Sequence, residues 1–329
     1  MLIDNHGRKI NYLRLAVTDR CNLRCVYCMP AAGLEWLPRK ELMTFEEMLR
    51  LCSLLVKMGI EKIRITGGEP FVRKDLMQLL TSLSRLNGLQ QLTITTNGVL
   101  TAPFVPELKK LGINSINLSL DTLDRDRFLT IAHRDELPKV LKTLDQLLLH
   151  NMDVKINTVV MENKNTEDII SIVELTKDLP INVRFIEEMP FNGEGKHPTI
   201  FYWDHIRILN RIKEKYPDIQ KIPDLISSTS YNYHIPGFKG DVGIIAAYSR
   251  TFCGTCNRIR ITPTGTLKTC LYDNGFLNIK DLIRKGYDDD NLKTFLVDAM
   301  NKRAKDGWEA EKNRASKMPV HESMATIGG

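Results

Sequence analysis

The sequence predicts an α/β protein that forms an incomplete (β/α)6-type barrel followed by a smaller α+β region. Over the first two-thirds of the 329 residues, β-rich runs alternate with amphipathic helical patterns. Such alternation is typical of parallel strands joined by right-handed crossovers. Near residue 190 it stops at a turn-rich segment, Pro190-Phe191-Asn192-Gly193-Glu194-Gly195. We therefore expect two units, residues 1–190 and residues 191–329.

Six segments of the first unit have the composition of strands, and the stretches between them have helical periodicity. The expected strands are Tyr12–Val17, Lys62–Thr66, Gln91–Thr95, Ser115–Leu120, Val154–Val160 and Val183–Glu187, and the expected helices include Thr44–Met58, Asp75–Leu86 and Glu167–Lys177. Six such units are two short of a closed eight-fold barrel. In the second unit we expect a helix at about Trp203–Lys215, a hairpin of Arg258–Thr262 and Thr266–Cys270, and two further helices.

Composition and charge narrow the class of protein. With 43% hydrophobic and 26% charged residues, the chain has the composition of an ordinary soluble protein. It has no run of about 20 apolar residues, and its first residues lack the apolar core of a signal peptide, so we expect a cytoplasmic protein without a membrane partner. The net charge of +6 suits a nucleic acid or a small polyanion. Because Lys and Arg are spread along the chain, the nucleic acid is disfavoured.

Six of the seven cysteines lie in two tight clusters, and the seventh, Cys52, is expected to be a buried helix residue. The first cluster, Cys21-Asn22-Leu23-Arg24-Cys25-Val26-Tyr27-Cys28, has C-x3-C-x2-C spacing and follows the first strand. A structural zinc site needs four protein ligands, and no fourth Cys or His lies nearby in the sequence. A [4Fe–4S] cluster held by three thiolates leaves one iron without a protein ligand, and that iron can chelate S-adenosylmethionine.

This spacing, with the aromatic Tyr27 before the last cysteine, resembles the radical S-adenosylmethionine superfamily. The resemblance implies that one electron cleaves S-adenosylmethionine and releases a 5′-deoxyadenosyl radical. The segment Thr66-Gly67-Gly68-Glu69-Pro70 follows the second strand and resembles the GGE motif of the superfamily, in which glycine carbonyls and the acidic residue can approach the methionine ammonium. Ser119 is a candidate ligand of the methionine carboxylate, with an ordinary strand-end hydroxyl as the alternative.

The second cluster consists of Cys253-Gly254-Thr255-Cys256 and Cys270. On its own, C-x2-C on a hairpin is most often a zinc ribbon, but a fourth ligand is again missing. Three ligands downstream of a radical-generating unit favour a second [4Fe–4S] cluster, which could bind substrate or pass an electron. Strand alternation places Arg258 and Arg260 on one face, where paired guanidiniums suit an anionic ligand, unless this is only a solvated face. No phosphate-loop motif occurs, so a nucleotide would be held by a cationic pocket.

Taken together, the motifs resemble the GTP 3′,8-cyclase (MoaA) family, which catalyses the first step of molybdenum cofactor biosynthesis. The resemblance covers essentially the whole chain and rests on both cysteine arrays, Leu13-Arg14-Leu15-Ala16-Val17-Thr18-Asp19-Arg20, Lys62-Ile63-Arg64-Ile65-Thr66-Gly67-Gly68-Glu69-Pro70 and Ile327-Gly328-Gly329. It implies two [4Fe–4S] clusters, one held by Cys21, Cys25 and Cys28 and the other by Cys253, Cys256 and Cys270. It also implies S-adenosylmethionine contacts from Tyr27, Gly68, Ser119 and Met189.

For the substrate, the resemblance implies GTP contacts from Arg14, Lys62, Arg64, Thr95, Lys155, Arg184, Arg258 and Arg260. Several of these are expected near the C-terminal ends of strands, where βα scaffolds build their sites. Arg258, Arg260, Gly328 and Gly329 are expected to act in catalysis, because glycines without side chains can enter a narrow pocket. The adenosyl radical would remove hydrogen from C3′ of the ribose, C3′ would attack C8 of guanine, and one electron would complete (8S)-3′,8-cyclo-7,8-dihydroguanosine 5′-triphosphate.

The implied partners are an electron donor such as flavodoxin or ferredoxin and a downstream cyclic pyranopterin synthase, and a homodimer is compatible with the sequence. Two other functions stay open at this point. A peptide-modifying radical enzyme with an auxiliary cluster would share the first array, but such enzymes tend to have more C-terminal cysteines. A zinc-ribbon nucleic-acid binder would suit the pI and the second array, but it leaves the first array and the Gly-Gly-Glu segment unexplained.

Overall fold

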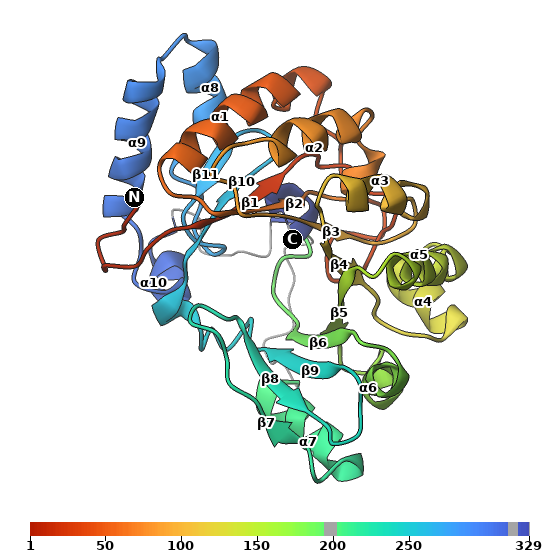
Figure 1. The fold of residues 1–329 in the computed structure, drawn as a ribbon. Coiled ribbons are helices and arrows are strands. Elements are labelled where there is room, and N and C mark those ends of the chain that lie inside the picture. Colours follow the sequence, from red (N-terminus) through yellow and green to blue (C-terminus); the bar gives the residue numbers. More distant parts are fainter. Residues whose placement is uncertain (194–202, 315–321, 329) are drawn as a thin grey trace.

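A computed structural model describes residues 1–193, 203–314 and 322–328. Within these ranges one twelve-stranded sheet curves around an open interior, with strand order β12-β11-β10-β1-β2-β3-β4-β5-β6-β9-β8-β7 (Figure 1). The strands are β1 (Tyr12–Ala16), β2 (Lys62–Thr66), β3 (Gln91–Thr96), β4 (Ser115–Ser119), β5 (Asp153–Val160), β6 (Asn182–Glu187), β7 (Gln220–Lys221), β8 (Ser230–His234), β9 (Asp241–Ile245), β10 (Arg258–Ile261), β11 (Thr266–Lys268) and β12 (Leu277–Asn278).

The six predicted strands of the first unit are all present and pair in parallel, so the expected incomplete barrel is confirmed. The sequence reading missed that strands from beyond residue 190 extend the parallel array at both ends: β9 pairs in parallel with β6, and β10 with β1. Beyond these, β11 and β12 add antiparallel strands at the β10 edge, and β8 and β7 add antiparallel strands at the β9 edge. The boundary near residue 190 stays a prediction, because strands from either side of it belong to one sheet.

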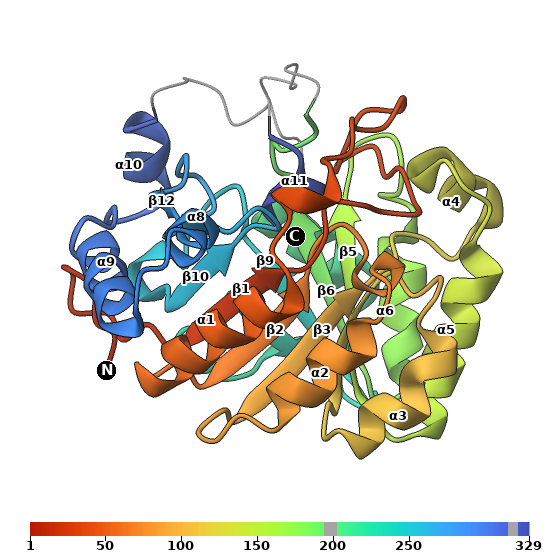
Figure 2. The same cartoon turned by 90° about the horizontal axis from the view of Figure 1, so that it is seen from above.

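Helices follow most strands and cover the outer side of the sheet (Figures 1 and 2). They are α1 (Phe45–Lys57), α2 (Leu76–Ser84), α3 (Val105–Lys110), α4 (Arg125–Ala132), α5 (Leu137–Leu149), α6 (Asp168–Asp178), α7 (His205–Lys215), α8 (Ile279–Arg284), α9 (Asp289–Asn301), α10 (Gly307–Lys312) and α11 (Met324–Ile327). The first begins at a capping box, in which the Thr44 hydroxyl accepts from the Glu47 amide and the Glu47 carboxylate accepts from the Thr44 amide.

The expectation of two helices after the hairpin was wrong, since the described residues form α8, α9, α10 and α11 there. The last two are only 6 and 4 residues long, too short to give a clear helical period in the sequence. A small core cluster packs Ile327 of α11 against Phe191, Tyr272 and Ala310. None of the described helices has both the length and the apolar character that crossing a bilayer requires.

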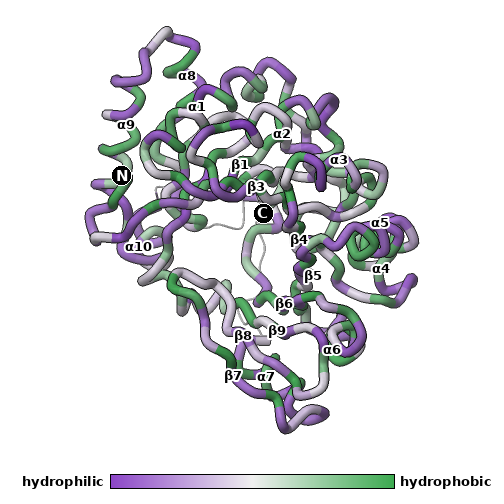
Figure 3. Tube along the Cα trace, in the orientation of Figure 1, coloured by the Kyte–Doolittle hydropathy of each residue, from purple (hydrophilic) through white to green (hydrophobic). Residues whose placement is uncertain are grey.

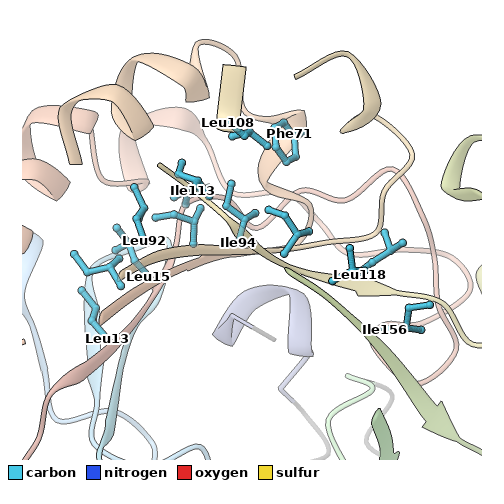
Figure 4. Close-up of a cluster of buried hydrophobic side chains, with 14 of the residues drawn as sticks. Leu13, Leu15, Phe71, Leu92, Ile94, Leu108, Ile113, Leu118 and Ile156 are labelled. Atoms are coloured by element: carbon cyan, nitrogen blue, oxygen red, sulfur yellow. The ribbon is translucent and has the colours of Figure 1, made fainter. Parts of the chain in front are cut away.

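Strand alternation separates the two faces of the sheet. On β1, Leu13 and Leu15 are fully buried and point toward the helices, and Ile94 of β3 and Leu118 of β4 lie farther along the same face of the sheet (Figure 4). Each such side chain contributes roughly 1.5–3 kcal/mol by leaving water. Hydrophobic residues follow the strands and the inner sides of the helices, and hydrophilic residues the outer sides (Figure 3). The alternate strand positions face the open interior, and the polar residues there form the site described next.

Candidate active site

A cavity of about 460 Å3 lies inside the curved sheet, and all six clustered cysteines line it. The sequence placed the two triads more than 220 residues apart (Cys28 and Cys253), and β10, which pairs with β1, brings them to one interior. Most of the other predicted site residues line the same cavity: Arg14, Tyr27, Lys62, Arg64, Gly68, Thr95, Ser119, Arg184, Met189, Arg258 and Arg260.

The first triad occupies the loop that follows β1. Cys28 donates its amide to the carbonyl of Cys25 at 2.9 Å, and the Sγ of Cys21 accepts from the Leu23 amide at 3.4 Å and from Asn97 Nδ2 at 3.6 Å. Burial raises the pKa of Cys21 to about 11, and burial together with neighbouring thiols raises the pKa values of Cys25 and Cys28 well above their usual range.

These buried thiols suit iron ligation. All three lie on one loop and line the same cavity, and a metal supplies the positive charge that keeps a ligating thiol deprotonated. Among the described residues, no group of three or more His, Cys, Asp and Glu side chains is close enough to hold a single metal ion. A cubane cluster has no such requirement, because it binds each thiolate at a different iron.

The Gly-Gly-Glu segment lies directly over the start of the cysteine loop. The amide of Gly68 donates to the Thr18 carbonyl and the amide of Glu69 to the Arg20 carbonyl, both at 2.8 Å. A Cβ on Gly68 would stand 2.2 Å from the Arg20 carbonyl oxygen, so this approach requires glycine. Gly68, Tyr27, Ser119 and Met189 all face the cavity, which is where the sequence expected them to contact S-adenosylmethionine.

The expected part of Glu69 in that contact has no support from its position. Its carboxylate is fully buried and accepts from the Phe71 amide at 3.1 Å, the Thr96 hydroxyl at 2.8 Å and the Asn97 amide at 2.7 Å. Burial raises its pKa to about 7, although these hydrogen bonds oppose the shift. Glu69 therefore ties two strand-end loops together, and through Asn97 it holds a donor against the Sγ of Cys21.

A set of cations covers the interior between the two triads. It comprises Arg14, Lys62, Arg64, Arg184, Arg258 and Arg260, from β1, β2, β6 and β10. The Nε atoms of Arg14, Arg64 and Arg184 are buried and have no hydrogen-bond partner, and none of the six cations forms an ion pair within the described part of the chain. Gathering unpaired cations is costly unless an anion binds there, so this set suits a polyanionic ligand.

Two details of the predicted GTP contacts differ from expectation. Most of the cations lie in the N-terminal or central parts of their strands, whereas the sequence reading placed several near the C-terminal ends; Lys62 and Arg258 are the first residues of β2 and β10. Lys155 lies beside the cavity and does not line it, because its Nζ pairs with Asp153. Thr95, near the end of β3, does face the cavity, and its buried hydroxyl has no hydrogen-bond partner.

The second triad spans a 3-10 turn at Cys253–Thr255, the start of β10 and the end of the hairpin. Burial raises the pKa of Cys270 to about 12. The pKa of Cys256 is lowered instead. Burial acts to raise it, but the nearby guanidiniums of Arg258 and Arg303 outweigh burial. Arg303 Nη2 lies 3.2 Å from the Sγ of Cys256. These thiols share the cavity with the cation set, which is the arrangement that the sequence predicted for a second cluster.

Gly328 reaches the cation set. Its carbonyl oxygen accepts from Arg260 Nη1, and a Cβ there would lie 2.9 Å from both Ala16 Cβ and Thr66 Oγ1. Its φ of +80° is also one that favours glycine. Gly329 lies outside the described residues.

Sequence reasoning missed four residues that line or support the cavity: Tyr12, Asn97, Arg250 and Arg303. Tyr12 stands two residues before Arg14 on the same strand, so alternation could have placed it on the interior face. Arg250 packs its guanidinium 3.5 Å from the ring centre of Tyr272. No local signal marks Arg303, because its contact with Cys256 joins segments 47 residues apart.

The profile described as Radical SAM superfamily matches residues 15–176, and the one described as Molybdenum Cofactor Synthesis C matches residues 181–308. The GTP 3′,8-cyclase of Clostridium botulinum is 41% identical over 283 residues, which are 86% of this chain and 88% of that protein. Molybdenum cofactor biosynthesis protein 1 of Bos taurus is 41% identical over 92% of this chain and 48% of its own length. The chain thus spans about half the length of several curated relatives that it matches.

Among solved structures, SuiB of Streptococcus suis superposes with a TM-score of 0.64 at 16% identity, over 96% of this chain and 76% of that one. At this identity the likeness shows a shared fold. The superfamily profile supports a [4Fe–4S] cluster and S-adenosylmethionine as cofactors. From the identity over most of both chains to the Clostridium enzyme, the chain belongs to the GTP 3′,8-cyclase family of the radical S-adenosylmethionine superfamily.

Proposed function

We propose that the protein is a radical S-adenosylmethionine GTP 3′,8-cyclase, a lyase that converts GTP to (8S)-3′,8-cyclo-7,8-dihydroguanosine 5′-triphosphate in the first step of molybdenum cofactor biosynthesis. One observation carries the proposal: a single cavity is lined by both cysteine triads and, between them, by six cations that form no ion pair within the described part of the chain. A nucleotide triphosphate supplies the negative charge that suits these cations.

In this proposal Cys21, Cys25 and Cys28 hold one [4Fe–4S] cluster, and Tyr27, Gly68, Ser119 and Met189 line the place for S-adenosylmethionine. When bound, this pair supplies the adenosyl radical that removes hydrogen from C3′ of the ribose. The chain itself positions and shields the reactants. Tyr27 donates to Asp121 Oδ2 at 2.9 Å, which fixes its ring at the cavity wall, and the close packing of Gly68 on Arg20 keeps the loop in place.

The cations hold the triphosphate. It carries roughly four negative charges, and guanidinium groups bind phosphate oxygens in a bidentate, oriented way. Arg14, Lys62, Arg64 and Arg184 come from strands of one sheet, which fixes the backbone positions from which their side chains reach the triphosphate. Lys155, held at the rim by Asp153, would join the set through its charge.

Cys253, Cys256 and Cys270 are proposed to hold a second [4Fe–4S] cluster on the nucleotide side. Arg258 and Arg260 would then face both the cluster and the substrate. Arg260 also binds the Gly328 carbonyl, so the segment Met324–Gly328 would close the cavity over the ribose and exclude water. Gly329 is proposed to act beside Gly328.

An electron donor such as flavodoxin or ferredoxin, a downstream cyclic pyranopterin synthase, a cytoplasmic location and a homodimer belong to this proposal as expectations. None of them rests on the cavity geometry.

The deciding experiment is anaerobic incubation of the reconstituted protein with GTP, S-adenosylmethionine and dithionite, followed by mass analysis. We expect equimolar 5′-deoxyadenosine and a cyclised nucleotide with the mass of GTP. Iron and sulfide analysis should give two cubane clusters per chain. Stoichiometric zinc with little iron would contradict the proposal, and 5′-deoxyadenosine formed only with a peptide substrate would favour a peptide-modifying enzyme.

A further inference from the structure

Tyr12 occupies the centre of the cation set, although no role has been given to it so far. It is the first residue of β1, and the sheet register places it directly beside Lys62 on β2 and Arg258 on β10. Its side chain faces the cavity and is 9% exposed. Any anion held by these cations must therefore come close to the phenol.

Three cations contact the Tyr12 ring. Lys62 Nζ lies 5.2 Å from the ring centre, and the Cζ atoms of Arg64 and Arg258 each lie 5.8 Å from it. These distances are within the range of a cation–π contact. The ring thus separates positive charges that would repel one another directly, and it fixes the spacing at which they meet a ligand.

Other acidic groups of the cavity are already occupied. Among the described lining residues the carboxylates are Asp121 and Glu187. Asp121 accepts from Tyr27 and from the Val159 amide, and Glu187 accepts from the backbone and side chains of His205 and Ser249. Neither carboxylate pairs with the cation set. The Cys256 thiol lies at its edge beside Arg258, and Tyr12 is the acidic group that lies among its members on β1, β2 and β10.

The charged groups around Tyr12 come from every strand packed near it. Arg14 lies on β1, Lys62 and Arg64 on β2, Arg258 on β10 and Arg184 on β6, while Asp153 and Lys155 of β5 form their own pair farther out. Burial alone raises the pKa of Tyr12, but Arg64, Arg14, Lys62 and Arg258 outweigh it and lower that pKa to about 7. The electrostatic field at the phenol therefore favours an anion.

We propose that Tyr12 is a positioning residue for the triphosphate: its phenolic oxygen balances the cations before the nucleotide binds and donates a hydrogen bond to a phosphate oxygen afterwards. The proposal rests on the proposed function for the identity of the anion. The charge balance is explicit: the triphosphate brings negative charge to the same cations, so the phenolate takes up one proton from the buffer. A phenol then remains that can donate to the phosphate, whereas a phenolate could only repel it.

Proton uptake separates this role from simple packing. We would titrate GTP into the anaerobic, cluster-loaded protein by calorimetry in two buffers of different ionisation enthalpy, at pH 6 and pH 8. The wild type should take up close to one more proton per nucleotide than Tyr12→Phe at pH 8, and the difference should vanish at pH 6. Because Tyr12→Phe keeps the ring, the cation contacts and the fold should be retained.

Affinity gives the second readout. At pH 6 the wild type should bind GTP about tenfold more tightly than Tyr12→Phe, the usual effect of losing one hydrogen bond to a charged group. By pH 8 this advantage in affinity should disappear. At one pH unit above a pKa of about 7, Tyr12 must first bind a proton before it can donate to the phosphate, and this step weakens GTP binding roughly tenfold. Tyr287→Phe is the matched control, because Tyr287 lies outside the cavity lining and its loss of a hydroxyl should leave both readouts unchanged.

A measurement on the wild type alone tests whether the triphosphate, and not the base, causes the proton uptake. Lys62, whose pKa burial lowers to about 8, can also take up a proton, so the assignment to Tyr12 rests on the comparison with Tyr12→Phe. Inorganic tripolyphosphate should cause the same proton uptake as GTP at pH 8, whereas guanosine should cause none. Equal proton uptake by the wild type and Tyr12→Phe, or uptake with guanosine, would overturn the role given to Tyr12. Failure of the wild type to bind GTP would instead contradict the proposed function, so the two failures are distinguishable.

Discussion

The guanidinium Nη2 of Arg303 lies 3.2 Å from the Sγ of Cys256. The side chain of Arg303 is 2% exposed and also pairs with Asp4 Oδ2 at 3.3 Å. If Cys256 binds an iron–sulfur cluster, this buried cation stabilises the more negative, reduced state. The reduction potential of such clusters depends on nearby charge and on hydrogen bonds to sulfur.

We therefore expect Arg303→Gln to lower the reduction potential of the second cluster. A hydrogen bond to a charged group is worth about 1.5–3 kcal/mol. Only the part by which it favours the reduced cluster shifts the potential, so the shift is at most roughly 65–130 mV for a one-electron couple. Potentiometric titration followed by electron paramagnetic resonance would measure it, with the first cluster as internal reference. Arg303→Lys should recover part of the shift, and Lys302→Gln, next to it but on the surface, should change nothing. An unaltered potential in Arg303→Gln would contradict the electrostatic role.

Asp4 anchors the same network from the N-terminal side. Its buried carboxylate accepts from Arg8 Nε at 2.6 Å, from the Arg8 amide at 2.9 Å and from the His6 amide at 3.0 Å. Arg8 in turn donates to the Cys253 carbonyl at 3.1 Å. Asp4→Asn leaves buried guanidiniums without their counter-charge, so we expect a loss of about 3–5 kcal/mol in the free energy of unfolding at pH 7, measured by urea denaturation of the cluster-free protein.

The pH dependence of that loss has a definite sign. Burial opposes ionisation of Asp4, but the hydrogen bonds from Arg8 and His6 lower its pKa below the ordinary 3.8. A carboxyl with a lowered pKa in the folded state stabilises the protein above its unfolded pKa, and this contribution is lost as the pH falls through the folded value. The gap between wild type and Asp4→Asn should therefore be constant from pH 7 to pH 5 and shrink below 3.8. Asp298→Asn breaks a surface pair and should cost less than about 1 kcal/mol.

These contacts mark the limit of what the sequence could predict. Strands β1 to β6 were found because each combines β-branched residues with a following helical period, both of which are local patterns. The short strand β9 was missed, since Asp241-Val242-Gly243-Ile244-Ile245 contains a glycine and finds its partner β6 only in the fold. The cysteines and the strand arginines were predicted because spacing and alternation are visible in one dimension.

The depth of the cation set along the strands was predicted less well. Several cations were expected at the C-terminal strand ends, where βα scaffolds usually place their sites. Lys62 and Arg258 instead begin their strands, so the cation set extends along the interior of the sheet toward the N-terminal strand ends. Tyr12 and Arg303 were missed because what matters about each is the charge of its neighbours. Those neighbours come from β10, the N-terminal residues and the turn after α9, which meet only in the fold.

The contact of Gly328 with Arg260 leads to a third prediction. Ala at this position would place a Cβ 2.9 Å from Ala16 Cβ and Thr66 Oγ1, at a φ of +80°. The left-handed backbone alone costs an L-residue about 1–2 kcal/mol, so the segment should leave the Arg260 site. We expect Gly328→Ala to lower kcat for GTP cyclisation at least ~10-fold, since each 1.36 kcal/mol is tenfold in rate, while S-adenosylmethionine cleavage without GTP is unchanged.

A comparison with Thr326→Ala controls for general disturbance of α11, because the Thr326 hydroxyl bonds only the local Ser323 carbonyl among the described residues. That variant should keep most of the cyclisation rate. Should Gly328→Ala cyclise GTP as fast as the wild type, the segment would have no part in closing the active site.

The two cysteine triads are expected to have separable tasks, and Cys253→Ala tests this. Cys253 lines the nucleotide side of the cavity, and Arg8 Nη1 donates a hydrogen bond to its carbonyl. Without this ligand the second cluster should be lost, so iron should fall by about four per chain. Some 5′-deoxyadenosine should still form from the intact first triad, but no cyclised nucleotide.

Cys52→Ala is the matched control, because Cys52 is fully buried in α1 and outside the cavity lining. It removes a thiol at a cost in stability alone and should keep both clusters. Wild-type cyclisation by Cys253→Ala would show that the nucleotide-side triad does not serve the reaction.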